Sequence, residues 1–353
     1  DYALWPTEWL QGPDVSSQLR YWQDELQGSP ELSTFPADRP RRQRHDFKGD
    51  ALRLQLPSGL YDRLTAFCRS HSVTLFNLML TALSELLRRY SGQDDASLGV
   101  GIASRRYKET EALIGMVINN VIIRTQADKN QSVVDALQTT SNKLVRASKN
   151  QDIPFDRVVE ATGVNRALGH NPLFQVLISI HDAPFPEERL PGLEGRLKLG
   201  INNGSAKFDM VLTLIPVASE NIGTHTAEKG VTIVWVYSTA LYDEATVRGL
   251  YDQYCRLLEN MATSPDVPVS SIPLVLDEDE RQAQSLANDT SREWADRRFV
   301  DEYVREYASR FPDKTAVEFG ESSLTYSELD RRVQLLAARL AQLSTSGDRL
   351  IGV

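Results

Sequence analysis

The chain has 353 residues, of which 41% are apolar, 25% are charged and 8% are aromatic, and its formal net charge is −9. This composition is typical of a globular protein with two or three folding units, and the acidic balance argues against nucleic acid as the main partner. Two distant cysteines, Cys68 and Cys255, exclude a disulfide framework and favour a reducing, cytoplasmic compartment. No apolar stretch approaches the ~18 residues of a membrane span, and the chain opens with neither Met nor a signal peptide, so we expect a piece of a longer protein.

Hydrophobic periodicity predicts a layered α/β unit in the first three quarters of the chain. The helical period indicates helices at 14–27, 58–71, 74–91, 131–149 and 243–262, with a short helix after Pro154. Alternating or continuous apolar runs indicate strands at 50–56, 96–102, 116–124, 172–181, 208–217 and 230–238. Because the strands alternate with long helices, we expect the helices to pack against a sheet.

A change in composition predicts a second unit. Residues 263–276 carry three prolines among Ser and Val, which is typical of a stiffened linker. Beyond it we expect helices at 277–287, 299–310 and 325–342, a strand at 315–319 and the start of another strand at 350–353. A unit of ~75 residues has a thin core for an α/β fold, so we expect an incomplete domain. The predicted organisation is a domain at 1–262, a linker at 263–276 and a second, partial domain at 277–353.

A search for catalytic groups finds no nucleophile elbow, phosphate loop or dinucleotide-binding motif. No two histidines have the spacing of metal ligands, and each is better explained as a surface or core residue. The least settled are His170 and His181, which bracket an apolar strand. An arginine cluster at 39–44 could hold a phosphate, although a solvated charged surface is the favoured interpretation in a proline-rich connection.

Two neighbouring amides stand out in the apolar run 114–124. Asn119 and Asn120 lie inside a predicted strand, where a buried amide without hydrogen bonds costs ~1–3 kcal/mol. Such a pair either binds a neighbouring backbone or faces a polar cavity, and both interpretations stay open.

Two further stretches have structural and functional interpretations. In 150–156, Asp152 is placed to cap the short helix that begins at Pro154. In 170–176, Pro172 precedes an apolar strand, a position that proline tolerates. A structural role is the simpler explanation of each stretch.

Taken in chain order, these stretches match the motifs of one protein family. The matching segments are Asp1 to Trp5 (fourth motif, Tyr-x-Asp-Tyr-Ala-x-Trp), Ile114, Gly115 and Asn119 (fifth, Ile-Gly-x-Phe-Val-Asn-Thr), Asn150 to Asp156 (sixth, His/Asn-Gln-Asp-x-Pro-Phe-Glu), and Arg166 with Asn171 to Val176 (seventh, Arg-Asp-x-Ser-Arg-Asn-Pro-Leu-Phe-Gln-Val). Over about 1–275 the chain thereby resembles the condensation domain of nonribosomal peptide synthetases. Residues 311–317 and 324–329 resemble the opening of an adenylation domain, which follows a condensation domain in an elongation module.

The sequence departs from the family pattern at several positions. The catalytic motif His-His-x-x-x-Asp-Gly does not occur in the chain, and the resemblance implies a place upstream of Asp1. Asn120 replaces the usual Thr of the fifth motif, and Ala167, Gly169 and His170 replace Asp, Ser and Arg of the seventh. The phosphate loop and catalytic lysine of an adenylation domain are also absent from the sequence.

The resemblance implies a chloramphenicol-acetyltransferase-like α/β lobe, with a mixed sheet and flanking helices, followed by a partial α/β adenylation piece. It implies the C-terminal lobe of a two-lobed domain whose tunnel receives phosphopantetheine arms from two carrier proteins. A floor loop is then expected at 100–112 and a latch near 182–206. The expected tunnel or structural residues are Asp1, Tyr2, Trp5, Gly115, Asn119, Asn120, Arg124, Gln151, Asp152, Pro154, Phe155, Arg166, Asn171 and Pro172. Of these, Asn119, Asn120 and Arg124 are expected to shape the tunnel wall, and Asp152 and Arg166 to brace it.

The parent domain would form an amide between donor and acceptor thioesters on upstream and downstream peptidyl carriers. The fragment alone is expected to be inactive, with no bound cofactor or metal; ATP and Mg²⁺ would serve only a complete adenylation domain. Its other expected partners are the missing lobe and the adenylation domain of the same module, with no nucleic acid and no membrane. Two alternatives remain, a docking platform for a carrier protein or an adenylation domain, and a coenzyme-A-dependent acyltransferase. The missing lobe would leave an exposed apolar face around 100–124 and 172–182 that favours self-association.

Overall fold

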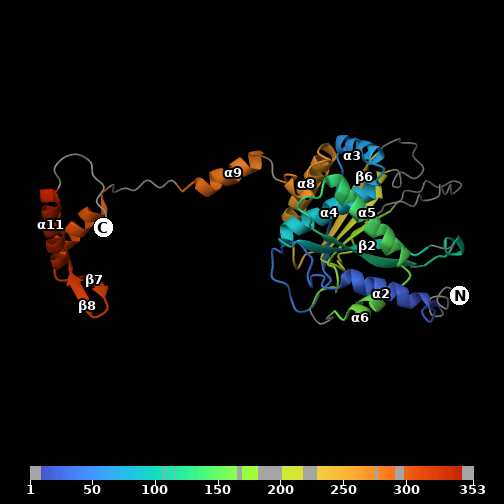
Figure 1. Ribbon diagram of the computed structural model, residues 1–353, viewed down its shortest axis with the longest axis horizontal. Helices are drawn as coiled ribbons and strands as arrows, with labels where there is room; N and C mark the ends of the chain where they lie inside the picture. The colour runs from blue at the N-terminus through green and yellow to red at the C-terminus, as the bar shows by residue number, and fades with distance from the viewer. Residues whose placement is uncertain are drawn as a thin grey trace. The chain divides into compact units, whose positions relative to one another are not determined.

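The structure is a computed structural model, and it describes residues 9–105, 108–115, 117–164, 169–181, 201–217, 229–274, 277–290 and 298–343. The chain divides into two compact units, Asp1–Asp277 and Glu278–Val353, which are described separately (Figure 1). Across the described ranges, none of the helices combines the length and the apolar character needed to cross a bilayer.

A six-stranded mixed sheet forms the centre of the first unit. Its strands are β1 (Gly49–Gln55), β2 (Asp95–Ala103), β3 (Ile118–Gln126), β4 (Val176–Ile180), β5 (Met210–Pro216) and β6 (Val231–Ser238). Their order across the sheet is β1-β6-β5-β4-β2-β3. Strand β4 runs parallel to β2 and β5, and the other neighbours are antiparallel. Strands β1 and β3 therefore form the two edges.

One face of this sheet forms the core. The strand register places six apolar side chains in one row across the sheet: Leu52, Trp235, Leu212, Ile178, Val100 and Val121. All six are buried, and Trp235 meets the ring of Tyr254 edge-on at 6.2 Å in helix α8 (Glu244–Thr263). Because successive side chains of a strand point to opposite faces, the neighbours of this row face away from the core.

The described helices of the first unit differ in how they begin, and only two of them have a side-chain cap. Besides α8 they are α2 (Asp14–Leu26), α3 (Ser58–Ser70), α4 (Leu75–Ser91), α5 (Val133–Lys149) and α6 (Phe155–Thr162). The hydroxyls of Thr74 and Ser132 accept backbone N–H groups at the starts of α4 and α5, and Gly92 adopts a φ of +68° after α4. Figure 1 shows α3, α4, α5 and α8 as one group, with α2 and α6 lying together apart from it.

Two strands are displaced from their predicted positions because the chain turns before each of them. The predicted strand 172–181 is shortened to β4, since Leu173 has a φ of +70° and the Phe174 N–H donates to the Pro172 carbonyl. The predicted strand 116–124 begins at Ile118, after a turn in which Gly115 has a φ of +153°. Both turns lie in motif segments. A regular strand in either segment would place the motif side chains in other positions.

The segment predicted as a linker packs against the first unit. Val269 and Ile272 are each 2% exposed, within and next to a short 3₁₀ turn, Val269–Ser271. The guanidinium of Arg89 donates to the carbonyls of Val269 and Ile272, and buried Glu85 in turn accepts from Arg89. Residues 263–274 are therefore an anchored part of this unit, because apolar side chains between the prolines supply contacts that the proline count does not reveal.

The described part of the second unit is small and loosely packed. After α9 (Asp277–Asn288) it contains α10 (Val300–Arg310), β7 (Thr315–Phe319), β8 (Ser322–Thr325) and α11 (Tyr326–Leu343). Strand β8 was not predicted; it pairs with β7 across a turn in which Gly320 has a φ of +61°. No residue of α10 is buried, and Tyr307 stacks only loosely, at 5.6 Å, against Phe311 and Tyr326.

Candidate functional site

The sheet face opposite the core carries a groove with a volume of about 670 Å³, which is the size of a small-molecule site. Its floor is formed by strands β2 to β6, and residues 203–208 form one side. Half of the lining residues have apolar side chains, and Lys207 is the only Lys, Arg, Asp or Glu among the described lining residues. A smaller hollow of about 220 Å³ continues toward β1 and shares His181 with the groove. The open face is therefore a long, nearly uncharged trough.

Small side chains leave room for this trough. Gly101 pairs with Asn120 across β2 and β3, and the parallel register of β4 brings Ser179 to the other side of Gly101. In the next row, Gly99 pairs with Leu177. Asn120 lines the groove and is half-buried.

The neighbouring amide, Asn119, binds a backbone instead. Its Nδ2 donates to the carbonyls of Gln151 and Ile153, both at 2.8 Å, and its Oδ1 accepts the Asn120 N–H at 2.9 Å. Asn119 thus holds the segment before α6 against β3, and it is also one of the residues that line the groove. The two amides therefore differ: Asn119 binds a neighbouring backbone, and Asn120 lines the groove.

Contrary to the prediction, Asp152 does not cap α6, because its carboxylate is turned toward α2. Its Oδ2 accepts from Gln18 Nε2 at 3.0 Å, and its N–H donates to Gln18 Oε1 at 3.3 Å. Pro154 occupies the N-cap position of α6 without a side-chain cap. Phe155, the first residue of that helix, meets Phe174 edge-on at 5.3 Å. The motif around Asp152 joins α2, α6 and β3.

Arg124 is likewise a brace, and it is not among the described residues that line the groove. The guanidinium forms an ion pair with Asp95 and donates to the carbonyls of Glu25, Gln27 and Gly28 at the end of α2. All its donor groups are thereby directed away from the groove. Arg124 lies near the far end of β3 from the groove, so alternation along the strand alone could not have placed it.

The segment after Asn171 supports the groove from behind its lining. Asn171 Nδ2 donates to the Lys207 carbonyl at 2.7 Å, next to the turn at Pro172. This turn sends Phe174 over Gly99, and Phe208, which lines the groove, stacks on Phe174 at 5.1 Å.

Gln175 fixes this segment, although sequence reasoning did not select it. It is 1% exposed; its Oε1 accepts the Ser33 N–H at 2.5 Å, and its Nε2 donates to the Asn171 carbonyl at 2.7 Å. A glutamine in the middle of an apolar strand pattern was the available signal, because a buried amide requires partners.

The arginine cluster divides into one half-buried residue and exposed ones. Arg41 forms a two-bonded pair with Asp209, which is 1% exposed and also accepts from Thr34. Burial lowers the pKa of Arg41, but the hydrogen bond and charge of Asp209 outweigh it and raise that pKa. Burial, and then the charge of Asp209, keep the pKa of Tyr242 well above its usual value. The favoured interpretation of the cluster, a solvated charged surface, is therefore wrong for Arg41.

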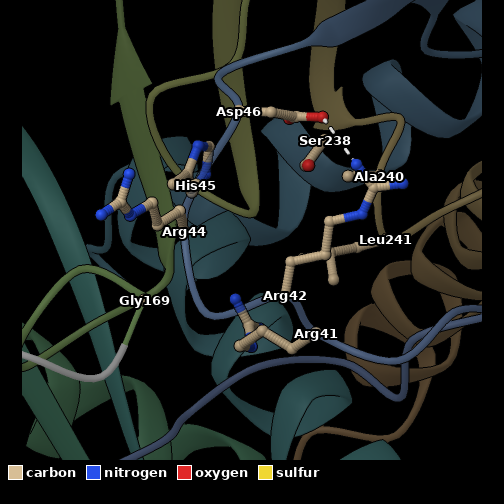
Figure 2. A pocket seen from close by; sticks show the side chains of 9 residues that line it. All are labelled: Arg41, Arg42, Arg44, His45, Asp46, Gly169, Ser238, Ala240 and Leu241. Atoms are coloured by element: carbon tan, nitrogen blue, oxygen red, sulfur yellow. Dashed lines mark ion pairs between the residues drawn. The ribbon is translucent and has the colours of Figure 1, made fainter.

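Arg41, Arg42 and Arg44 also line a very small hollow. In Figure 2 the Arg42 side chain reaches Asp46, at 3.9 Å, while Arg44 extends away from it. The hollow measures about 20 Å³, which is room for one water molecule and not for a phosphate. His45 Nε2 is buried beside it without a hydrogen-bond partner in the described part of the chain. This site does not suit a phosphate ligand.

The described lining of the groove contains no pair of groups arranged for acid–base catalysis. His181 is exposed at its edge, and His170 Nδ1 lies 3.0 Å from the Asn171 carbonyl. Within the described ranges, no cluster of three His, Cys, Asp or Glu side chains could hold a metal ion. Burial raises the pKa of Cys68 and Cys255 to about 11 each, so neither is a ready nucleophile at neutral pH.

Several expected site residues lie outside the described ones: Asp1, Tyr2, Trp5 and Arg166, together with most of the expected latch and residues 106–107 of the expected floor loop. The expected apolar face is present only in part. Ile114 and Ile118 are exposed, whereas the apolar residues 173–178 are buried under the turn and the strand pairing.

A family model described as "Condensation domain" matches residues 1–284. The chain belongs to the condensation-domain family. The expected resemblance to condensation domains of peptide synthetases is thereby confirmed, and so is the expected fold of a mixed sheet with flanking helices.

Relatives of this condensation-domain chain are large synthetases. It is 31% identical over 353 residues to Malpinin synthetase of Mortierella alpina, covering 100% of this chain and 4% of the relative. It is 30% identical over 353 residues to Phosphinothricin tripeptide synthetase PhsC of Streptomyces viridochromogenes, covering 100% of this chain and 32% of the relative. The chain thus spans less than a third of the length of either protein.

Solved structures share the fold. A four-domain nonribosomal peptide synthetase, holo-AB3403 bound to AMP and glycine, has a TM-score of 0.72 at 20% identity, covering 94% of this chain and 25% of that one. The X-domain from teicoplanin biosynthesis has a TM-score of 0.68 at 22% identity, covering 78% of this chain and 61% of that one.

Proposed function

We propose that the chain forms one wall of the chamber in which a condensation domain joins two carrier-bound thioesters. The observation that carries this proposal is the long, nearly uncharged groove on the open sheet face of a member of the condensation-domain family. A trough of this kind suits an extended acyl chain, because its apolar walls bury methylene groups and carry almost no charge to desolvate. A second lobe, outside this chain, would cover the trough.

The proposed reaction is amide formation. The amine of the acceptor attacks the thioester carbonyl of the donor; a C–N bond forms and the C–S bond breaks. The nitrogen loses a proton, and the departing sulfur ends as a thiol on the donor's phosphopantetheine. Holding the amine and the thioester in line supplies much of the rate gain, since effective molarities of ~10⁵ M or more are typical of aligned reactants.

This chain would align substrates without supplying the acid–base group. The sequence contains no adjacent histidines and therefore no His-His-x-x-x-Asp-Gly motif. No carboxylate lines the described part of the groove, and its histidine stands at the edge. We expect the chain alone to give no amide product with two loaded carriers, and turnover at the rate of a complete condensation domain would contradict this proposal.

The same proposal covers the neighbouring parts of the assembly. The second unit would open an adenylation domain, which is supported by relatives that match the whole chain beyond the family model's end at 284. ATP and Mg²⁺ would bind only when that domain is complete. Free thiols at Cys68 and Cys255 suit a cytoplasmic location. The partners would be peptidyl carriers, the second lobe and the adenylation domain.

Photo-crosslinking tests the proposed wall. A carrier protein is loaded with phosphopantetheine whose thiol bears a diazirine acyl group, mixed with the chain and irradiated, and the modified peptides are identified by mass spectrometry. We expect labels in β2, β3, β4 or residues 203–208. The unmodified carrier mixed with a free diazirine acid is the control. Labels confined to the helical face or to the second unit would refute the proposal.

A further inference from the structure

The floor of the groove has a polar notch at Gly101. A Cβ atom at this position would lie 3.3 Å from Ser179 Cβ and 3.9 Å from both Asn120 Oδ1 and Leu177 Cδ2. The space above the glycine is thus bounded by an amide on one side and by a hydroxyl-bearing side chain on the other. The φ of Gly101 is one that any residue can adopt, so the backbone conformation does not require glycine here. The missing side chain instead leaves the space above the strand open.

The polar groups of the notch retain hydrogen-bonding capacity. No side-chain partner of Asn120 occurs in the described part of the chain, although Asn119 next to it has three bonds from its side chain. Ser179 Oγ has one long contact, 3.4 Å to Thr213 Oγ1. A carboxamide offers two donors and one acceptor, and a hydroxyl offers one donor and two lone pairs. Both residues can therefore bind an occupant of the groove.

The surroundings restrict what that occupant can be. Apolar side chains, including Ile102, Ile118 and Val211, line the groove around the notch. A charged group would lose its hydration there without a counter-charge, because Lys207 is the only charged residue among the described lining. A secondary amide in an otherwise apolar chain matches both features, since its N–H and C=O pair with a carboxamide at little desolvation cost.

We propose that the notch formed by Gly101, Asn120 and Ser179 binds a secondary amide of an extended chain lying across β3, β2 and β4. This assignment rests on the proposed function, which brings carrier-borne acyl chains to the groove. Two sources provide the same chemistry, the pantetheine arm and a peptidyl donor. Asn120 is a positioning residue here, and it stands where the family motif has Thr, whose shorter side chain would leave a wider notch.

Binding of two small probes tests the assignment. The full chain, labelled with ¹⁵N, is titrated with free pantetheine and with an N-acetyl dipeptide N-methylamide, and dissociation constants are taken from chemical-shift changes. We expect Asn120→Leu to weaken the binding of the recognised probe about fivefold, the typical worth of one neutral hydrogen bond. Gly101→Ala should weaken it similarly by filling the notch. Asn142→Leu, at an exposed asparagine of α5, is the matched control and should change nothing.

The two probes separate the sources. A loss confined to pantetheine assigns the notch to the carrier's arm, and a loss confined to the dipeptide assigns it to the acyl chain. An alkyl thiol without amides should bind wild type and Asn120→Leu equally. The proposal is overturned if neither amide probe binds wild type, if both bind Asn120→Leu as well as wild type, or if the shifts fall outside β2, β3 and β4. Crosslinks to the groove together with such a result would retain the proposed function and remove only the notch.

Discussion

Replacing Gly99 by alanine tests how the end of the groove is packed. A Cβ atom at this position would lie 2.2 Å from Cε2 and 2.5 Å from Cδ2 of Phe174, far inside contact distance. The ring cannot easily give way, because Phe174 is fully buried, stacked on Phe208 and met edge-on by Phe155. The turn at Leu173 also fixes its backbone.

We expect this overpacking to lower the free energy of unfolding by ~3 kcal/mol, the upper end for an added methyl group in a packed core. Gly101→Ala is the matched control in the same strand: its nearest contact would be 3.3 Å, so we expect a loss below ~1 kcal/mol. Urea unfolding followed by tryptophan fluorescence measures both, since Trp22 and Trp235 are buried in this unit.

A double variant distinguishes the contact from a general effect on the strand. Phe174→Leu removes the clashing ring, so Gly99→Ala should cost much less in that background. The two losses should then deviate from additivity by ~1 kcal/mol or more, as residues in contact do. Additive losses, or a Gly99→Ala variant within ~0.5 kcal/mol of wild type, would refute the packing argument.

Three further outcomes are expected. Asp209→Asn should lower the free energy of unfolding by ~3 kcal/mol in urea titrations, the lower end for a broken buried ion pair, because it leaves half-buried Arg41 without its counter-charge; a loss no larger than that of a surface variant would contradict this. Arg89→Met should speed amide hydrogen exchange in the anchored segment after α8, and unchanged exchange would show that the guanidinium does not hold it. Cys68 and Cys255, whose pKa values burial raises to about 11, should react slowly with iodoacetamide at pH 8 in the folded chain. Unfolded thiols ionise first, so stability should fall as the pH rises from about 9 to 11, and flat stability across that window would exclude the shift.

The regular elements could be predicted because each carries its own periodicity. Helix α4 and strand β6 appear within a residue or two of their expected bounds. The short hairpin strand β8 was missed, since four residues with two serines have little apolar pattern. The segment after α8 was misread because its prolines are local signals, while its anchoring depends on Arg89, far away in the sequence.

The sequence located the motif segments but not the roles of their individual side chains. The described motif stretches contact one another, through Asn119 with residues 151–153 and through Phe155 with Phe174, but sequence alone could not assign different roles to Asn119 and Asn120. Their roles differ because adjacent strand residues face opposite ways, and the register that decides between them is a tertiary property. The roles of Arg124 and Gln175 could not be read from the sequence because their hydrogen-bond partners are distant along the chain.

Strand β3 is an edge strand of the sheet, and two of its polar side chains bind segments that lie beside this edge. Asn119 and Arg124 hold the segments 151–153 and 25–28 alongside this edge through five carbonyl contacts. An uncovered edge offers its backbone groups to a strand of another molecule. Variants at either residue should therefore show themselves first as aggregates during expression.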